Sequence, residues 1–162
     1  DQNMVWVISS NGANGQKVYL TTDGGDTWQN KTTTALDGHQ PLDILYQSGT
    51  NDLVYLASNY AVFFWDQIAS DWIIYSDGLP LLTRALRFKP FYRDSKLRLS
   101  SSRGIWEAPF AVNSIPTAYP MTENDVVYCQ RDTIQFEDYS FLDHTGSSWQ
   151  WNFSPAPAYI SN

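Results

Sequence analysis

The feature that most constrains this sequence is a short β-like segment that recurs along the chain. Residues 5–9, 54–58 and 97–101 each start with alternating apolar positions and end in serine, at separations of 49 and 43 residues. A short turn and a second apolar segment follow each copy, at residues 18–20, 62–64 and 105–107. Self-similarity at a nearly fixed period indicates one supersecondary unit that is used several times.

The rest of the chain favours strands over helices. Further short apolar runs at residues 42–46, 72–75 and 84–88 are separated by Gly, Asn, Asp and Pro. Only residues 79–83 are expected to form a helical turn. A repeat of about 45 residues with about four short strands is typical of β-propeller blades. We therefore expect an all-β fold, in which residues 1–110 form the last about three blades of a β-propeller, each a four-stranded antiparallel sheet.

Composition narrows the classes of partner. Hydrophobic residues make up 43% of the 162 residues, aromatic residues 15% and charged residues 17%, which suits sheets with polar outer faces. The net charge of −7 argues against nucleic acid, because phosphate binding needs clustered Lys and Arg. No apolar run approaches the roughly 20 residues of a membrane-spanning helix, so we expect no membrane insertion. The chain begins at Asp1 without an initiator Met, from which we expect a segment of a secreted protein.

One loop between two expected strands carries a dense turn motif. Residues 21–28 read Thr-Thr-Asp-Gly-Gly-Asp-Thr-Trp. The two glycines allow positive φ in a tight turn, and the Asp23 carboxylate can accept hydrogen bonds from loop amides. Trp28 can begin the return strand and pack its ring between sheets. The alternative is a catalytic or calcium-binding pair of Asp23 and Asp26, but the loop lacks the further carboxylates and carbonyl spacing of a calcium site.

This loop resembles the Asp-box, [ST]-x-D-x-G-x-[TS]-W, at all of its fixed positions. These positions are Thr21, Asp23, Gly25, Thr27 and Trp28. The resemblance implies a structural turn at the propeller periphery, with no catalytic residue, no cofactor and no metal. A degenerate box lies 44 residues later, where Trp72 takes the place of Trp28. Gln67 and Ala69 there take the places of the box Asp and Gly, and the third repeat has no box.

Two further segments refine the resemblance. Residues 75–80 (Tyr-Ser-Asp-Gly-Leu-Pro) and 102–107 (Ser-Arg-Gly-Ile-Trp-Glu) look like sortilin-type propellers of large bacterial proteins exported by type IX secretion. This resemblance implies a bacterial protein that is secreted or held at the cell surface. It implies as partners a carbohydrate or another surface protein, beside the remainder of the same polypeptide. Sialidases share the Asp-box, but their arginine triad and their Tyr and Glu pair are distributed over a whole propeller.

The composition changes over residues 111–124, which we expect to be a linker. After it, residues 129–140 and 147–153 resemble the first half of a PKD domain, written C-x-G-D-x-[VI]-x-F-x-D-x-S and S-x-x-W-x-W-x-F. Arg131 departs from this pattern at the usual Gly. The resemblance implies that residues 125–162 are part of an immunoglobulin-like β-sandwich, a spacer or adhesion module. Cys129 is either a buried small side chain or half of a disulfide whose partner lies elsewhere. Thr133 fits a bacterial O-glycosylation pattern.

Other polar clusters have simpler interpretations. Asp66 and Asp71 flank an expected hairpin turn, which favours a solvated turn over a glycosidase pair. Glu137 and Asp138 are adjacent in an expected strand and point to opposite faces. The basic residues are expected at the surface, with one lining a central channel as the alternative: Arg84, Arg87, Arg93, Arg98 and Arg103. The aromatic residues Tyr60, Phe91 and Tyr92 are expected to pack between blades, with sugar stacking as the alternative.

These features together favour a non-catalytic segment of a large multidomain surface protein, used for display, adhesion or partner binding. The alternative is part of a secreted carbohydrate-active hydrolase of the sialidase or glucanase type, with catalytic residues outside this segment.

Overall fold

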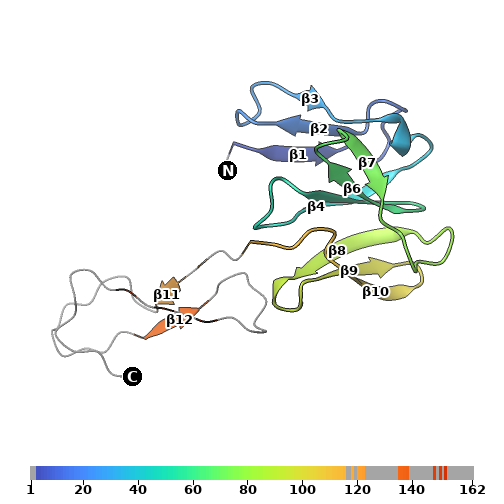
Figure 1. Ribbon diagram of the computed structural model, residues 1–162. Coiled ribbons are helices and arrows are strands. Elements are labelled where there is room, and N and C mark those ends of the chain that lie inside the picture. Colours follow the sequence, from blue (N-terminus) through green and yellow to red (C-terminus); the bar gives the residue numbers. More distant parts are fainter. Residues whose placement is uncertain are drawn as a thin grey trace.

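The computed structural model describes residues 3–115, 118, 120–122, 135–138, 148, 150 and 152. This part of the chain is all-β, as the sequence predicts, and its strands between residues 5 and 109 form three antiparallel sheets (Figure 1). The described helical structure is limited to two 3-10 turns, at Thr34–Leu36 and Tyr92–Asp94. Residues 79–83 form turns instead of the expected helical turn.

Each sheet is a meander in which strands that follow one another in the sequence are hydrogen-bonded neighbours. The first sheet holds β1 (Val5–Ile8), β2 (Val18–Thr21) and β3 (Gln29–Asn30). The second holds β4 (Pro41–Tyr46), β5 (Val54–Ser58), β6 (Val62–Asp66) and β7 (Asp71–Ile74). The third holds β8 (Ala85–Phe91), β9 (Lys96–Ser101) and β10 (Gly104–Pro109).

Four strands, as expected for every repeat, occur only in the second sheet. The first sheet has no described counterpart of β4, and the third has no described counterpart of β7. After β10 the chain leaves the sheet instead of turning back along it. The N–H of Ile115 instead donates to the Gly49 carbonyl oxygen at 2.5 Å, beside the hairpin between β4 and β5.

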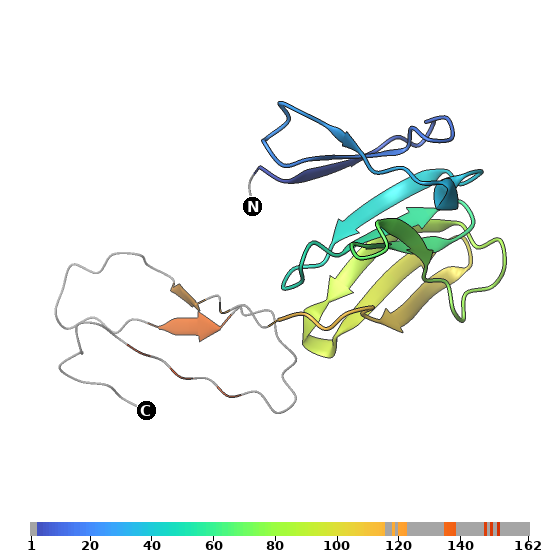
Figure 2. The same ribbon diagram turned by 45° about the horizontal axis from the view of Figure 1, so that its top comes forward.

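The three sheets are stacked face to face in sequence order, as both views show (Figures 1 and 2). The central strand β5 is buried along its whole length. Val54 and Leu56 belong to a cluster shared with the first sheet, whereas Tyr55 and Ala57 belong to a cluster shared with the third. Because successive side chains of a strand point to opposite faces, the second sheet is covered on both faces.

Strand register confirms the sequence repeat. The residue pairs that lie directly opposite each other in the three sheets are Trp6 with Leu20, Tyr55 with Phe64, and Arg98 with Glu107. These pairs are related by the separations found in the sequence. A β-bulge also recurs at equivalent places, between Pro41 and Asp43 in β4 and between Ala85 and Arg87 in β8.

Two serine hydroxyls close equivalent hairpins in the second and third sheets. Ser58 Oγ accepts from the N–H two residues later at 3.3 Å and donates to the carbonyl three residues later at 2.8 Å. Ser101 Oγ makes the same two bonds, at 3.1 and 2.9 Å. This shared turn explains why the repeated segment ends in serine, since a serine hydroxyl can bond its own following backbone.

A second recurring hydroxyl ties the chain after β3 and after β7 back to its sheet. Thr32 Oγ1 accepts from the Val18 N–H at 2.9 Å and donates to the Val18 carbonyl at 3.3 Å. Ser76 Oγ bonds Val62 in the same way, at 2.9 and 3.2 Å. This pair was not predicted from the sequence, because a lone Thr and a lone Ser carry no local pattern.

The described part of the C-terminal region is a separate two-stranded antiparallel sheet of β11 (Pro120–Thr122) and β12 (Phe136–Asp138). β11 falls inside residues 111–124, the segment that we expected to be a linker. Glu137 and Asp138 lie in β12, as predicted. Cys129, Arg131 and Thr133 lie outside the described residues, as do most of the residues that resemble a PKD domain.

Candidate functional site

The loop of residues 21–28 is closed by hydrogen bonds between its own members. Both oxygens of the Asp23 carboxylate are engaged. Oδ1 accepts from Thr21 Oγ1 at 2.6 Å and from the Thr27 N–H at 2.9 Å, and Oδ2 accepts from Thr27 Oγ1 at 2.6 Å. Thr21 Oγ1 in turn accepts from the Gly25 N–H at 2.9 Å. The five matched positions therefore form one circuit, in which Trp28 Nε1 donates to the Gly25 carbonyl at 3.1 Å.

Backbone geometry explains the two glycines in this loop. Gly24 and Gly25 adopt φ values of 77° and 110°, a region that L-residues with a Cβ rarely enter. The Gly24 N–H donates to the Asn3 carbonyl at 2.9 Å, which ties the loop to the segment before β1. Asp23 is exposed, yet the Thr21 and Thr27 hydroxyls hold the pKa of its carboxyl well below its usual range.

Asp23→Ala should lower the urea midpoint of unfolding at pH 7, because it leaves the donors of Thr21 and Thr27 without their shared acceptor. The folded-state pKa of Asp23 is depressed, so its contribution is complete above the unfolded pKa of about 3.9 and is lost as pH falls below that value. The wild-type advantage should therefore shrink between pH 5 and pH 2. Asp26→Ala is the matched control, since Asp26 makes no side-chain hydrogen bond within the described part. An unchanged midpoint for Asp23→Ala at pH 7 would contradict the structural role.

Trp28 and Trp72 occupy equivalent places but differ sharply in burial. Trp72 lies opposite Trp65 in the β6–β7 pair. Since Leu20 pairs with Gln29, Trp28 lies opposite Thr21 in the same way. Trp72 is 2% exposed, whereas Trp28 is 46% exposed and does not fill a gap between sheets as we expected. The reason is position: the face that carries Trp28 is not covered by another sheet within the described residues.

Trp72 forms the contact between the first and second sheets. Its ring lies 6.1 Å from the Trp6 ring and 5.3 Å from the Trp65 ring, both at steep interplanar angles. Its indole Nε1 donates to the Lys31 carbonyl at 2.8 Å, just after β3. The residue of the degenerate box is therefore the one that packs between sheets.

The degenerate loop uses a different carboxylate from the one that the alignment indicates. Gln67, at the place of Asp23, turns to the neighbouring hairpin and donates to the Asn51 carbonyl at 2.7 Å. Asp66 caps the turn instead, accepting from the N–H groups of Ile68 and Ala69 at 2.8 and 3.1 Å. Asp71 accepts from the Thr33 hydroxyl and from the Trp72 N–H. Asp66 thus stabilises the hairpin turn, and Asp71 joins β7 to the segment after β3.

A cavity of about 250 Å³ lies between the second and third sheets. Its wall combines apolar side chains of β6, β8, β9 and β10 with Tyr75, Asp77 and Glu107. Trp106 also lines it, and its buried indole Nε1 has no hydrogen-bond partner among the described residues. This cavity was not predicted from the sequence.

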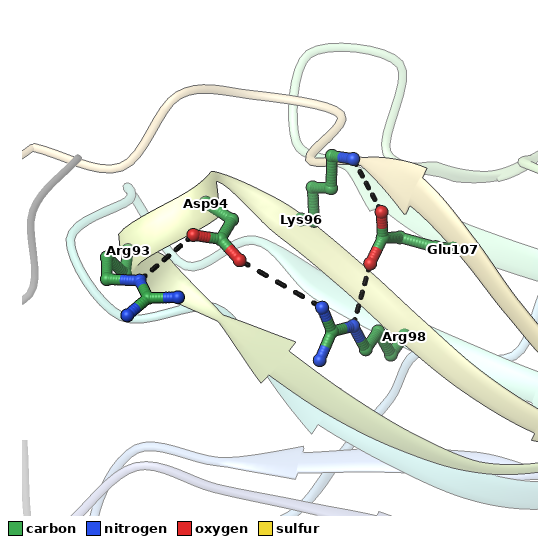
Figure 3. A network of polar contacts seen from close by, with 5 residues as sticks. All are labelled: Arg93, Asp94, Lys96, Arg98 and Glu107. Atoms are coloured by element: carbon green, nitrogen blue, oxygen red, sulfur yellow. Dashed lines mark hydrogen bonds and ion pairs between the residues drawn. The ribbon is translucent and has the colours of Figure 1, made fainter. Parts of the chain in front are cut away.

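The outer face of the third sheet carries a network of ion pairs (Figure 3). Glu107 accepts from Lys96 Nζ at 2.5 Å and from Arg98 Nε at 2.7 Å, which holds the pKa of its carboxyl below its usual range. Asp94 bridges Arg98 to Arg93, with N–O distances of 3.9 and 3.1 Å. Arg98 and Glu107 occupy the places that buried Tyr55 and half-buried Phe64 hold in the second sheet. This face is therefore suited to contact with water, and the side chains of the network are all partly exposed.

The remaining basic and aromatic candidates are structural or exposed. Arg98 stacks on the Phe91 ring, 3.6 Å from its centroid, and Tyr92 packs against Phe110. Tyr60 is 52% exposed. The side chains of Arg84, just before β8, and of Arg87, next to its bulge, are both exposed, as expected.

Within the described residues, no group of three or more His, Cys, Asp and Glu side chains could hold a metal ion. No helix in that part has the length and apolar character needed to cross a membrane. Comparison of the chain with known protein families, curated proteins and solved structures gives no match.

Proposed function

We propose that the chain is a non-catalytic structural segment, the last about three blades of an Asp-box β-propeller followed by part of a PKD-like sandwich. It serves a larger bacterial protein, secreted or held at the cell surface, in display, adhesion or partner binding. The observation that carries this proposal is the stack of three antiparallel sheets with equivalent register and bulges. The closed hydrogen-bond circuit of Asp23 supports it, because an Asp-box is expected to stabilise a turn.

The state of the carboxylates supports a non-catalytic role for this segment. Asp23 and Asp66 each accept hydrogen bonds from the turn that they stabilise, and Asp71 accepts from Trp72 of its own strand and from the Thr33 hydroxyl. A glycosidase pair needs one carboxyl group with a raised pKa to act as the acid. Hydrogen bonds instead hold the pKa values of two carboxyl groups in the described part, Asp23 and Glu107, below their usual range.

The charged outer face of the third sheet indicates on which side further blades of such a propeller would pack. A sheet that covered this face would have to provide polar partners for Arg98 and Glu107, since desolvating charges without partners is costly. The outer face of the first sheet is different: Val5 and Val7 are each 42% exposed and Trp28 is beside them. Further blades therefore fit the first sheet better than the third.

The purified chain should release no aryl alcohol from aryl sialosides or β-glucosides above the rate in buffer. On intact cells of the source bacterium, an antibody against the chain should bind, and external protease should remove the signal. Hydrolysis that is lost in Asp66→Asn or Asp71→Asn would place catalysis in this segment. Antibody binding only after cell lysis would contradict the surface location.

A further inference from the structure

The contact between the first and second sheets shows how this repeat fills the space between neighbours. β7 pairs with β6 and places Trp72 opposite Trp65, and both rings are buried, at 2% and 6% exposure. The Trp72 N–H finds its acceptor in the chain that follows β3. Two large rings, one of them from the fourth strand, therefore close this interface.

The contact between the second and third sheets lacks both rings. Ala108 stands at the place of Trp65, because β10 and β6 are related by 43 residues and Ala108 pairs with Leu97. No fourth strand is described beside β10, so no described residue stands at the place of Trp72. The cavity lies in this space, and its wall includes Ala108, Trp106 and Tyr75. Tyr75 holds the place of Lys31, whose carbonyl accepts the Trp72 N–H.

The open edge of β10 has backbone groups that a strand can pair with. In β6, the Val62 carbonyl accepts from the Tyr75 N–H, so Val62 directs its backbone groups away from β5. Alternation along an antiparallel ladder then gives Ile105 and Glu107, the equivalents in β10, the same direction toward the open edge. Pro109, next in this series, has no N–H to leave unpaired, and its carbonyl accepts from Tyr75 Oη at 2.8 Å.

We propose that β10 is a docking edge for an extended strand of a partner polypeptide, which runs antiparallel to β10 and inserts a tryptophan opposite Ala108 into the cavity between the second and third sheets. The strand takes the place that β7 holds in the second sheet. Backbone hydrogen bonds with β10 supply affinity. The cavity accepts the tryptophan side chain of the added strand and supplies specificity, as in other cases of strand addition to a sheet edge. This site goes beyond the proposed display role, and it does not depend on a propeller.

The chemistry of the site favours a strand over other occupants. A small apolar ligand would fill the cavity but leave the N–H and carbonyl groups of Ile105 and Glu107 to water. In a second copy of the chain, Trp72 of β7 is already buried and β3 has two residues, so neither of these edges can supply the inserted strand. The cavity volume of about 250 Å³ is of the size of one tryptophan residue.

The test uses a labelled synthetic peptide with the sequence of residues 69–76, Ala-Ser-Asp-Trp-Ile-Ile-Tyr-Ser, which the chain itself pairs in this way. Binding to the full chain is followed by fluorescence anisotropy. We expect saturable binding that weakens at least tenfold when the peptide Trp is replaced by Ala. We expect the same loss when the peptide is N-methylated at the residues that correspond to Ile73 and Tyr75, which face the paired strand.

Two variants of the chain show where the peptide binds. Ala108→Trp places an indole ring in the cavity, which has room for one tryptophan, so binding should weaken at least tenfold with an unchanged circular dichroism spectrum. Ala108→Leu fills less of the cavity and takes the place of Ala108→Trp if that variant does not fold. Amide exchange at Ile105 and Glu107 should slow when peptide is bound. Binding that is unaffected by both Ala108 variants, or binding of the N-methylated peptide with full affinity, would overturn the proposal. Dimerisation of the chain through β10 would overturn it in favour of a second copy.

Discussion

Replacing Trp72 with alanine should lower the free energy of unfolding by about 3–5 kcal/mol. The side chain is 2% exposed and packs against Trp6 of one sheet and Trp65 of its own. Its loss removes a large apolar contact and leaves a cavity between two sheets, whose backbones cannot both move in to fill it. It also leaves the Lys31 carbonyl without the indole donor. Chemical unfolding at neutral pH, followed by tryptophan-independent far-UV circular dichroism, measures this change.

Trp28→Ala is the matched control for this prediction. Trp28 holds the equivalent place in the first sheet and has the complete turn motif, but it is 46% exposed. Its loss should cost about 1 kcal/mol or less, as for other exposed positions. Equal effects of the two substitutions would show that the turn motif determines stability, and would contradict the assignment of Trp72 as the contact between sheets.

Gln47→Ala should lower the free energy of unfolding by about 2–4 kcal/mol, because it breaks a buried polar network. Gln47 is fully buried, and its Oε1 accepts from Tyr55 Oη at 2.8 Å. Its Nε2 donates to the Val112 carbonyl at 2.7 Å and to Ser114 Oγ at 2.8 Å. Removal of the amide leaves the buried Tyr55 hydroxyl without its acceptor, which costs about 1–3 kcal/mol, and also frees the Val112 carbonyl and the Ser114 hydroxyl.

The same network holds the chain that leaves the third sheet. Tyr55 Oη also accepts from the Ala111 N–H at 2.8 Å, and burial raises the pKa of Tyr55, so the hydroxyl remains a donor to Gln47. In Gln47→Ala, the rate of amide exchange at Ala111 should rise more, relative to the wild-type chain, than the rate at the core of β5. Tyr55→Phe is the control, because it removes the hydroxyl and keeps the ring. Slow exchange at Ala111 in both variants would show that residues 111–114 are held by other contacts.

The sequence predicted the strands and their repeat because both depend on local chemistry. Alternating apolar residues between turns specify a strand, and a register slip of one residue would turn those side chains to the other face. Copies with the same alternation therefore pair in the same way, as Tyr55 with Phe64 and Arg98 with Glu107 do. The closed turn around Asp23 was predictable for the same reason, since its bonds join residues at most four positions apart.

What the sequence did not predict depends on contacts between distant residues. Gln47 bonds residues 65 and 67 positions later, and no local pattern marks it. Trp28 has the complete turn motif but is half-exposed, whereas Trp72 lacks most of the motif but is buried. The difference arises because burial depends on whether a neighbouring sheet covers the residue. The sequence contains one indication of the cavity: a small residue, Ala108, at the place of Trp65. This equivalence can be recognised only once the strand register is known.

An experimental structure of the chain tests the central claim, that residues 5–109 are three copies of one unit stacked face to face. The account predicts that Trp6 lies opposite Leu20, Tyr55 opposite Phe64 and Arg98 opposite Glu107, with the sheet of β4–β7 between the other two. A shift of one residue in any of these pairs, or a third sheet that packs against the first instead of the second, would contradict it.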